Sequence, residues 1–233
     1  MDLKIKDVAE LLNVSETTIR RWLSDGKIPA YRINHQYRFS RTEIEDWVLG
    51  SKLGNSIDTD SVKQKQEESE EPPHSTGSRQ YSLYRAIHRG GVYHDVPGST
   101  KEEVIRNSLQ MVARSLNLDA EVLIDLVLDR ENLQPTALNH GIGIPHTRDS
   151  LVRLPFDAVT VVFPEQEIEY GSLDGKPVHT LLFLFAREDK RHLHLLAKIA
   201  HLSSREEIVD YLKTKPSKQQ LLEYIKDWET SLQ

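Results

Sequence analysis

The chain has 233 residues and no cysteine, so it is long enough for two domains but has no thiol for disulfides, zinc–thiolate sites or thiol catalysis. Its 36 acidic and 30 basic residues give a formal net charge of −6, which is typical of a soluble protein. No apolar stretch is long enough to span a bilayer, and no signal peptide opens the sequence. We therefore expect a cytoplasmic protein without membrane insertion.

The first 50 residues predict a small domain of helices with one hairpin. A short helix precedes a tight turn, and Ser15 is a suitable N-cap for a second helix. Residues 30–33 and 37–40 are expected to pair as strands around a tip at residues 34–36, and Thr42 is expected to cap a closing helix. The residues expected to face the core are Val8, Leu11, Leu12, Ile19, Trp22, Leu23, Ile44, Trp47 and Val48.

Residues 8–22, 26–32 and 38–47 resemble helix-turn-helix DNA-binding domains of the excisionase/MerR type. The resemblance implies a small winged helix-turn-helix domain, mainly α, whose second helix enters the major groove while the hairpin contacts phosphates or the minor groove. The residues expected to contact double-stranded DNA are Thr17, Arg20, Arg21, Arg32 and Arg38, with Arg41 beside the hairpin and the acidic Glu43, Glu45 and Asp46 elsewhere. A helix-turn-helix used for protein contact is the alternative.

Residues 51–80 are rich in Ser, Lys, Gln and Glu and contain almost no large apolar side chain. Such a composition cannot bury enough surface to order itself. We therefore expect a flexible linker between one domain at residues 1–50 and another at residues 81–233. The marginal helical pattern within the linker consists of Leu53, Ile57 and Val62.

The remaining residues have the pattern of a compact α/β domain. A capping box at Thr100 and Glu103, followed by an N-cap at Asp119, predicts two consecutive helices. Two short runs of β-branched or aromatic residues predict buried strands. The main predicted elements are helices at residues 101–116, 206–212 and 218–228, and strands at residues 158–163 and 180–185.

The sequence Gly-Ile-Gly-Ile-Pro-His ends at His146. Isoleucine favours a strand, and Pro145 lacks the backbone donor that a strand needs, so we expect the strand to end there. His146 would then lie at a strand tip, where a partner could reach it. Because a histidine by itself is more often an ordinary surface or core residue, its function depends on its surroundings.

Residues 129–148 read DRENLQPTALNHGIGIPHTR and resemble the active-site block of enzyme IIA domains of the fructose/mannitol/nitrogen type, from the bacterial phosphoenolpyruvate phosphotransferase system. The resemblance extends over about residues 81–228. It implies a mixed sheet flanked by helices, and it implies that His146 accepts a phosphoryl group. Two departures are Ala137 and Asn139, which occupy positions that are usually glycine in the family.

A second histidine, His192, begins a helical stretch that reads RHLHLLAKIAHLS. The family has its second active-site histidine here, which implies that His192 hydrogen-bonds a phosphohistidine or, when protonated, balances its charge. A helix start also offers N–H groups and a positive dipole end to a phosphate. Helical spacing places His192, Leu195, Leu196 and Ile199 on one face, and His194, Lys198 and His201 on a face expected to be solvated.

Phosphoryl transfer to a histidine needs a neutral ring nitrogen in line with the donor, while a hydrogen-bond acceptor holds the other ring nitrogen. We assign that acceptor to the backbone carbonyls of residues 147–150. Arg148 and Thr136 are candidates to bind the phosphoryl oxygens, although a solvated Arg148 and a turn role for Thr136 fit the sequence equally well. Arg130 and Glu131 are expected to brace the loop.

No cofactor and no metal site are expected. The scattered histidines suggest two metal-binding pairs, His140 with His146 and His192 with His194. The second pair is a poor chelate, because residues two apart on a helix do not share a face.

Three functions fit these patterns. The first is a DNA-binding regulator whose His146 accepts phosphate from phosphorylated HPr or a nitrogen-branch homologue. The second is a sugar-transport relay that passes the phosphate to an enzyme IIB. The third is a DNA-binding protein whose enzyme IIA domain is only an interaction scaffold. Absence of an HPr, IIB or IIC module favours the first function, and whether such a phosphocarrier counts as an enzyme stays open.

Overall fold

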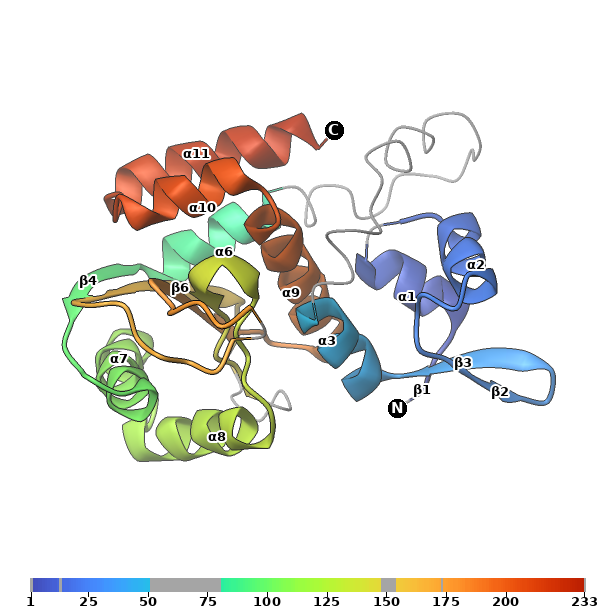
Figure 1. Ribbon diagram of the computed structural model, residues 1–233, viewed down its shortest axis with the longest axis horizontal. Coiled ribbons are helices and arrows are strands. Elements are labelled where there is room, and N and C mark those ends of the chain that lie inside the picture. The colour runs from blue at the N-terminus through green and yellow to red at the C-terminus, as the bar shows by residue number, and fades with distance from the viewer. Residues whose placement is uncertain (1, 13, 51–80, 148–153, 173, 233) are drawn as a thin grey trace.

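The computed structural model describes residues 2–12, 14–50, 81–147, 154–172 and 174–232. The expected linker at residues 51–80, with its marginal helical pattern at Leu53, Ile57 and Val62, and Arg148 lie outside the described residues. In Figure 1 the first two helices and the hairpin lie at one end and the sheet of the C-terminal region at the other, with α3 (Arg41–Leu49) and α9 (Asp189–Ser203) between them.

The helix-turn-helix consists of α1 (Ile5–Leu12) and α2 (Glu16–Ser24). Ser15 is the N-cap of α2, as predicted, because its side chain accepts the backbone N–H of Thr18 at 3.1 Å. The predicted core is confirmed, except that Leu23 is only half-buried. Its buried members are Val8, Leu11, Leu12, Ile19, Trp22, Ile44, Trp47 and Val48.

The hairpin pairs β2 (Tyr31–Ile33) with β3 (Gln36–Ser40) in antiparallel register. Its turn contains only Asn34 and His35, whose φ angles are 47° and 63°. Two left-handed residues suit a two-residue hairpin, because their twist matches that of the strands. Gln36 therefore belongs to the strand, and the expected three-residue tip is wrong.

Helix α3 begins immediately after the hairpin. Ser40 is its N-cap, with the side chain accepting the backbone N–H of Glu43 at 3.5 Å, so the expected cap at Thr42 is wrong. A short strand, β1 (Asp2–Leu3), pairs with the other edge of β3. A strand of two residues is too short to show the alternation of apolar and polar residues by which a sequence predicts a strand.

The C-terminal region contains a four-stranded sheet in the order β4-β6-β7-β5. The strands are β4 (Val92–Val96), β6 (Ala158–Pro164), β7 (Thr180–Phe185) and β5 (Ile142–Gly143). Strand β6 runs antiparallel to β7, whereas the two outer pairs are parallel, so the expected mixed sheet is confirmed. Every residue of the two central strands is buried, as their apolar runs predict.

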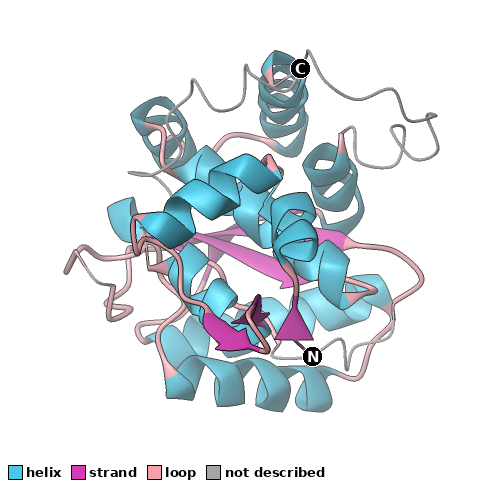
Figure 2. Cartoon of the chain, turned by 90° about the vertical axis from the view of Figure 1, so that its right-hand side faces the viewer, coloured by secondary structure: helices cyan, strands magenta, loops and turns pink. Residues whose placement is uncertain are grey.

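Helices cover both faces of this sheet, as Figure 2 shows from the side. The capping box at Thr100 and Glu103 and the N-cap at Asp119 are both present, as predicted. The helices other than α9 are α6 (Ser82–Gly90), α7 (Lys101–Leu116), α8 (Ala120–Leu133), α10 (Glu206–Lys213) and α11 (Lys218–Ser231). Within the described part of the chain, no helix combines the length and the apolar character needed to cross a membrane.

Two apolar clusters lie on opposite faces of the sheet. One joins α7 and α8 to the sheet, and the other joins it to α6, α9 and α11. The second cluster continues into the N-terminal region, because Val8, Leu12 and Val48 belong to it together with Leu195 and Leu196. Helices α1 and α3 thus pack on α9, which places α3 at the start of that helix.

Candidate functional site

The turn before β5 depends on two left-handed residues. His140 and Gly141 have φ angles of 68° and 78°. A Cβ on Gly141 would lie 2.6 Å from the His179 ring, so this position requires glycine for space as well as for conformation. Ala137 and Asn139 are not among the residues with positive φ, which explains why the chain tolerates their departure from the family pattern.

His146 follows β5 and forms a parallel bridge with Leu184 on β7. Its Nδ1 lies 2.7 Å from the carbonyl oxygen of Ile144. Because a carbonyl only accepts, Nδ1 must carry the proton, and the lone pair of the neutral ring is on Nε2. The acceptor is therefore the carbonyl of residue 144, and its expected place at residues 147–150 is wrong.

His192 lies in the first turn of α9, beside His146. The centroids of the two rings are 5.1 Å apart, and the ring planes are tilted by 56°. The backbone N–H of His192 donates to the backbone carbonyl oxygen of Glu188 at 2.9 Å, so this N–H already has a partner at the start of the helix. The structure thus brings the two predicted histidines together through their side chains.

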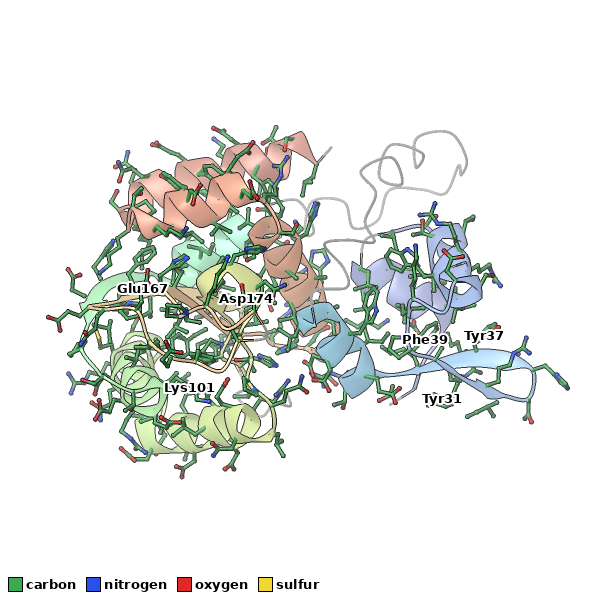
Figure 3. All side chains as sticks on the ribbon, viewed as in Figure 1. Tyr31, Tyr37, Phe39, Lys101, Glu167 and Asp174 are labelled. Atoms are coloured by element: carbon green, nitrogen blue, oxygen red, sulfur yellow. The ribbon has the colours of Figure 1, made fainter. Side chains whose placement is uncertain are left out.

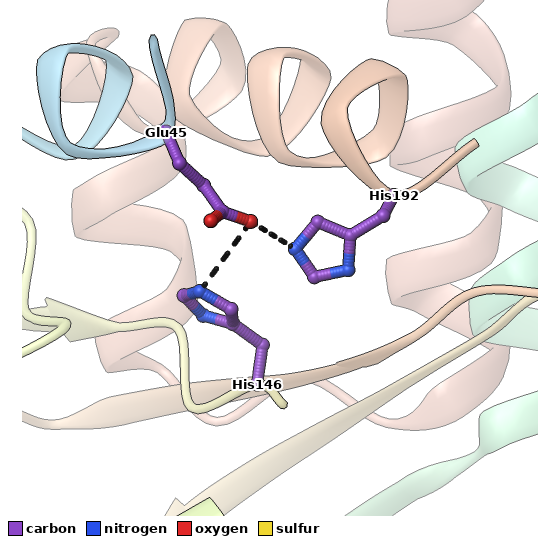
Figure 4. A group of neighbouring side chains, drawn as sticks. All are labelled: Glu45, His146 and His192. Atoms are coloured by element: carbon purple, nitrogen blue, oxygen red, sulfur yellow. Dashed lines mark ion pairs between the residues drawn. The ribbon is translucent and has the colours of Figure 1, made fainter. Parts of the chain in front are cut away.

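A third side chain, which sequence reasoning missed, completes the cluster. Glu45 of α3 points between the two rings, with Oε1 2.8 Å from Nε2 of His192 and 3.9 Å from Nε2 of His146 (Figure 4). Burial alone would raise the pKa of Glu45, but His192, His146 and Arg41 together outweigh burial, and the pKa lies below its ordinary value. The acidic residue expected away from the functional surfaces is thus an ionised member of the site.

The expectation that a partner can reach His146 is wrong for this arrangement. His146 is 0% exposed and His192 is 4% exposed. The cover includes α3 of the N-terminal region, so the site is closed by a different part of the same chain.

Burial also determines the charge of His146. Loss of solvent, followed by the neighbouring His192, lowers the pKa of His146 to about 3, despite the opposite effect of Glu45. The ring is therefore neutral at pH 7, with the Nε2 lone pair that a nucleophile requires.

This lowered pKa predicts an acid-sensitive contribution to stability. The unfolded chain protonates His146 below a pH of about 6.5, whereas the folded chain keeps it neutral to about pH 3, so acid favours unfolding throughout that window. From pH 7 to pH 5, the free energy of unfolding of the wild type should fall by about 1–2 kcal/mol more than that of His146→Gln. Denaturant melts of both proteins at the two pH values measure this difference. Equal pH dependence would contradict a buried, neutral His146.

Glu131 is the centre of a buried hydrogen-bond network beneath the site. It accepts the backbone N–H of Thr136 at 3.1 Å, the Thr136 hydroxyl, and the hydroxyl of Tyr170 at 3.1 Å. Burial raises the pKa of Glu131. The Thr136 hydroxyl is thus donated to Glu131, which fits a loop-bracing role better than the expected contact with phosphate.

Arg130 has two contacts of different kinds. It donates to the carbonyl of Gln134 at 3.0 Å, which braces the loop. It also donates to the carboxylate of Asp46 on α3 at 3.2 Å. A residue of the predicted active-site block is therefore paired with the helix-turn-helix region.

The expected solvated face of α9 is partly wrong. His194 is buried, with Nε2 3.2 Å from the Ser82 hydroxyl oxygen, and Lys198 is paired with Glu229. Packing of α6 and α11 against α9 covers this face, which the local sequence does not reveal.

The predicted DNA-contacting residues lie on the surface of the N-terminal region. Thr17, Arg20, Arg21 and Arg32 are exposed, and Arg38 is half-buried with a hydrogen bond to Gln36 at 2.7 Å. Figure 3 shows Tyr31 and Tyr37 on the same hairpin, which extends away from the sheet of the C-terminal region.

Arg41 does not belong to this surface, contrary to expectation. Its guanidinium lies 2.9 Å from Asp189 at the start of α9 and 3.9 Å from Glu45. It therefore faces the C-terminal region beside the two histidines.

The donor atoms of Glu45, His146 and His192 all lie within 4.8 Å of one another. A set of two histidines and a carboxylate could hold a divalent transition metal. However, the Arg41 guanidinium already lies beside the same carboxylate, and a fixed positive charge there opposes a cation. Among the described residues, the group of three possible metal ligands contains neither His140 nor His194, so neither suggested pair is part of it.

Comparisons with known proteins agree with this two-part architecture. Residues 3–51 match the model "Helix-turn-helix domain", and residues 87–228 match "Phosphoenolpyruvate-dependent sugar phosphotransferase system, EIIA 2". The class is therefore an α/β phosphotransferase-type domain joined to a helix-turn-helix domain. Since the second match covers more than half of the chain, the chain belongs to the EIIA 2 family of that phosphotransferase system.

Individual relatives each match a part of the chain. A "Nitrogen regulatory protein" of Pseudomonas aeruginosa is 33% identical over 136 residues, which are 57% of this chain and 87% of that protein. A "PTS system fructose-specific EIIABC component" of Bacillus subtilis is 28% identical over 56% of this chain but only 21% of its own length. The "Transcriptional repressor DcmR" of Methylorubrum extorquens is 48% identical over 48 residues, which are 20% of this chain and 18% of that protein.

A solved structure has the same fold as the C-terminal region. The nitrogen regulatory protein IIA-Ntr of Neisseria meningitidis aligns with a TM-score of 0.55 and 21% identity, over 61% of this chain and 98% of that chain.

Proposed function

We propose that this chain is a transcriptional regulator linked to the phosphotransferase system, in which His146 carries a phosphoryl group and the N-terminal domain binds DNA. The observation that carries the proposal is the neutral His146, whose Nδ1–H is held by the carbonyl of Ile144 and whose ring centroid lies 5.1 Å from that of a second imidazole. We assign the DNA-binding domain to residues 1–50, the linker to residues 51–80 and the phosphocarrier domain to residues 81–233. Such a regulator would act in the cytoplasm.

The proposed donor is the phosphohistidine of HPr or of its nitrogen-branch homologue. The Nε2 lone pair of His146 forms the new N–P bond, and the bond from phosphorus to the donor ring breaks with its electron pair returning to the donor nitrogen. The Nδ1 proton of His146 stays on its hydrogen bond to Ile144. His192 acts as a positioning residue that donates to the phosphoryl oxygens, which makes the charge of the product less costly.

The nitrogen regulatory relatives and the exposed arginines of the N-terminal region support a regulator. Thr17, Arg20 and Arg21 would enter the major groove, and Arg32 and Arg38 would contact flanking DNA. The likeness to a fructose-specific EIIABC component supports a second candidate, in which the chain passes phosphate to an enzyme IIB. Release of label from the phosphorylated chain on addition of purified IIB would favour that relay.

Phosphate uptake tests the proposal directly. With labelled phosphoenolpyruvate, enzyme I and HPr, or their nitrogen-branch counterparts, the wild type should acquire acid-labile phosphate, whereas His146→Ala should acquire none. His88→Ala, which changes an exposed histidine on α6, is the matched control and should label as the wild type does. Label retained on His146→Ala would mean that the acceptor is another residue.

A further inference from the structure

We propose that α3 is a gate over the phosphoacceptor site: docked α3 excludes the phosphoryl donor, and a phosphoryl group on His146 excludes docked α3. The inference rests on the proposed function, because it takes His146 as the acceptor. It gives Glu45 a regulatory role in phosphorylation, which is separate from the role of the helix-turn-helix in DNA binding.

Glu45 lies where a phosphoryl group on His146 would have to be. Glu45 Oε1 lies 3.9 Å from the Nε2 atom that would form the N–P bond, and 2.8 Å from Nε2 of His192. A phosphoryl group on His146 would extend from Nε2 into the space that this carboxylate fills (Figure 4). The carboxylate therefore occupies the place of the phosphoryl oxygens, and the two groups cannot be present together.

The charges of α3 also oppose a phosphoryl group at this site. Two neighbouring carboxylates of α3 face groups suited to an anion, Glu45 toward His192 and Asp46 toward Arg130 at 3.2 Å. A phosphoryl group adds about two negative charges at this point. Because the cluster is buried, repulsion between that charge and Glu45 is weakly screened, so phosphorylation drives α3 away.

Docked α3 also closes the access of a donor to the site. The Nε2 atoms of both histidines and Oε1 of Glu45 are all buried. In-line attack requires the donor phosphorus to approach Nε2 of His146. With α3 docked, a donor protein has no path to that atom, so transfer must wait for α3 to leave.

The remaining interface favours docking of the unphosphorylated chain. Arg41 pairs with Asp189 at 2.9 Å, and Lys190 lies 3.9 Å from Asp7 on α1. Apolar side chains of α1 and α3 join those of α9 in one cluster. The contacts that hold α3 thus surround the site of modification, so a change at His146 acts on the whole interface.

Docking leaves the proposed DNA surface uncovered. Arg20 and Arg21 on α2 are exposed while α3 is docked, and α2 lies on the far side of α1 from α9 in Figure 1. The gate therefore changes the position of the EIIA domain relative to DNA, instead of uncovering the second helix. DNA affinity should change less than the phosphorylation rate when Glu45 is altered.

The first experiment compares phosphorylation rates of full-length variants. Glu45→Gln keeps the shape of the side chain but removes its charge, and it should raise the initial rate of phosphate uptake about 10-fold or more. Glu43→Gln removes the same charge from an exposed position on the same helix and should stay within about twofold of the wild type. A slower Glu45→Gln would mean that the carboxylate assists the transfer, which would overturn the gate.

The second experiment measures the position of the N-terminal region. Because the chain has no cysteine, Ser24→Cys and Gln110→Cys introduce two exposed sites for spin labels, on α2 and α7. The distance between the labels should change on phosphorylation of the wild type, and it should not change when His146→Ala is treated with the same donors. An unchanged distance in the phosphorylated wild type would contradict the gate.

The two experiments separate this inference from the proposed function. Phosphate uptake by neither the wild type nor Glu45→Gln would contradict the proposed function and, with it, the gate. Equal uptake by both, with an unchanged label distance, would contradict the gate alone and leave His146 as the acceptor.

Discussion

Replacing Arg20 and Arg21 together with alanine is expected to lower the DNA affinity of the chain about 30-fold or more. Both side chains are exposed on α2, the proposed major-groove helix, and each contact to DNA contributes about 1–3 kcal/mol. If both arginines contact phosphates, the salt dependence of binding should also weaken by about two units in the logarithmic slope. Gel shifts at several salt concentrations, with a duplex that the wild type selects from a random library, measure both quantities.

The matched control is Arg114→Ala, which removes an exposed arginine from α7 in the EIIA domain and should leave affinity unchanged. Wild-type affinity in the double variant would mean that α2 is not the recognition helix. Failure of the wild type to select any duplex would instead favour protein contact as the role of the helix-turn-helix.

Replacing Glu131 with alanine is expected to destabilise the EIIA domain by about 3–5 kcal/mol. The substitution leaves the Thr136 N–H, the Thr136 hydroxyl and the Tyr170 hydroxyl without their acceptor in a buried place, and it opens a cavity. The melting temperature should fall by about 6–20 °C, since about 2–4 °C corresponds to 1 kcal/mol in a domain of this size. Differential scanning calorimetry of the full chain measures the change.

Glu131→Gln is the informative control, because its amide oxygen still accepts two of these hydrogen bonds. Its NH2 group cannot accept from the Thr136 N–H or pair with Lys101, so it should cost about 1–3 kcal/mol, less than Glu131→Ala. If both variants lose a similar amount of stability, the contribution of Glu131 comes from its volume or its charge and not from its acceptor oxygens.

Local signals were sufficient for much of the fold. The capping box at Thr100, the N-caps at Ser15 and Asp119, and the apolar runs of β6 and β7 depend on neighbours in sequence, and all are confirmed. In contrast, β1 has only two residues, and β4 carries half-exposed and exposed residues that give no buried-strand pattern. Such elements are determined by the strand beside them, which a single sequence does not specify.

The pairing of His146 with His192 followed from two family-like blocks, but Glu45 did not. Its place depends on the docking of one domain on another, and a glutamate within a short helix looks like a solvated residue. One signal was available. Leu49, four residues after Glu45, is apolar yet lies off the face of Ile44, Trp47 and Val48, which indicates that a second side of α3 is covered.

The most direct test of the account identifies the atom that carries the phosphate. Full-length protein with ¹⁵N-labelled histidine is phosphorylated by phosphoenolpyruvate, enzyme I and HPr, or by their nitrogen-branch counterparts, and its imidazole nitrogens are observed by NMR. We expect phosphate on Nε2 of His146, with the proton still on Nδ1, which the carbonyl of Ile144 holds. Phosphate on Nδ1 of His146, or on any other residue, would contradict it.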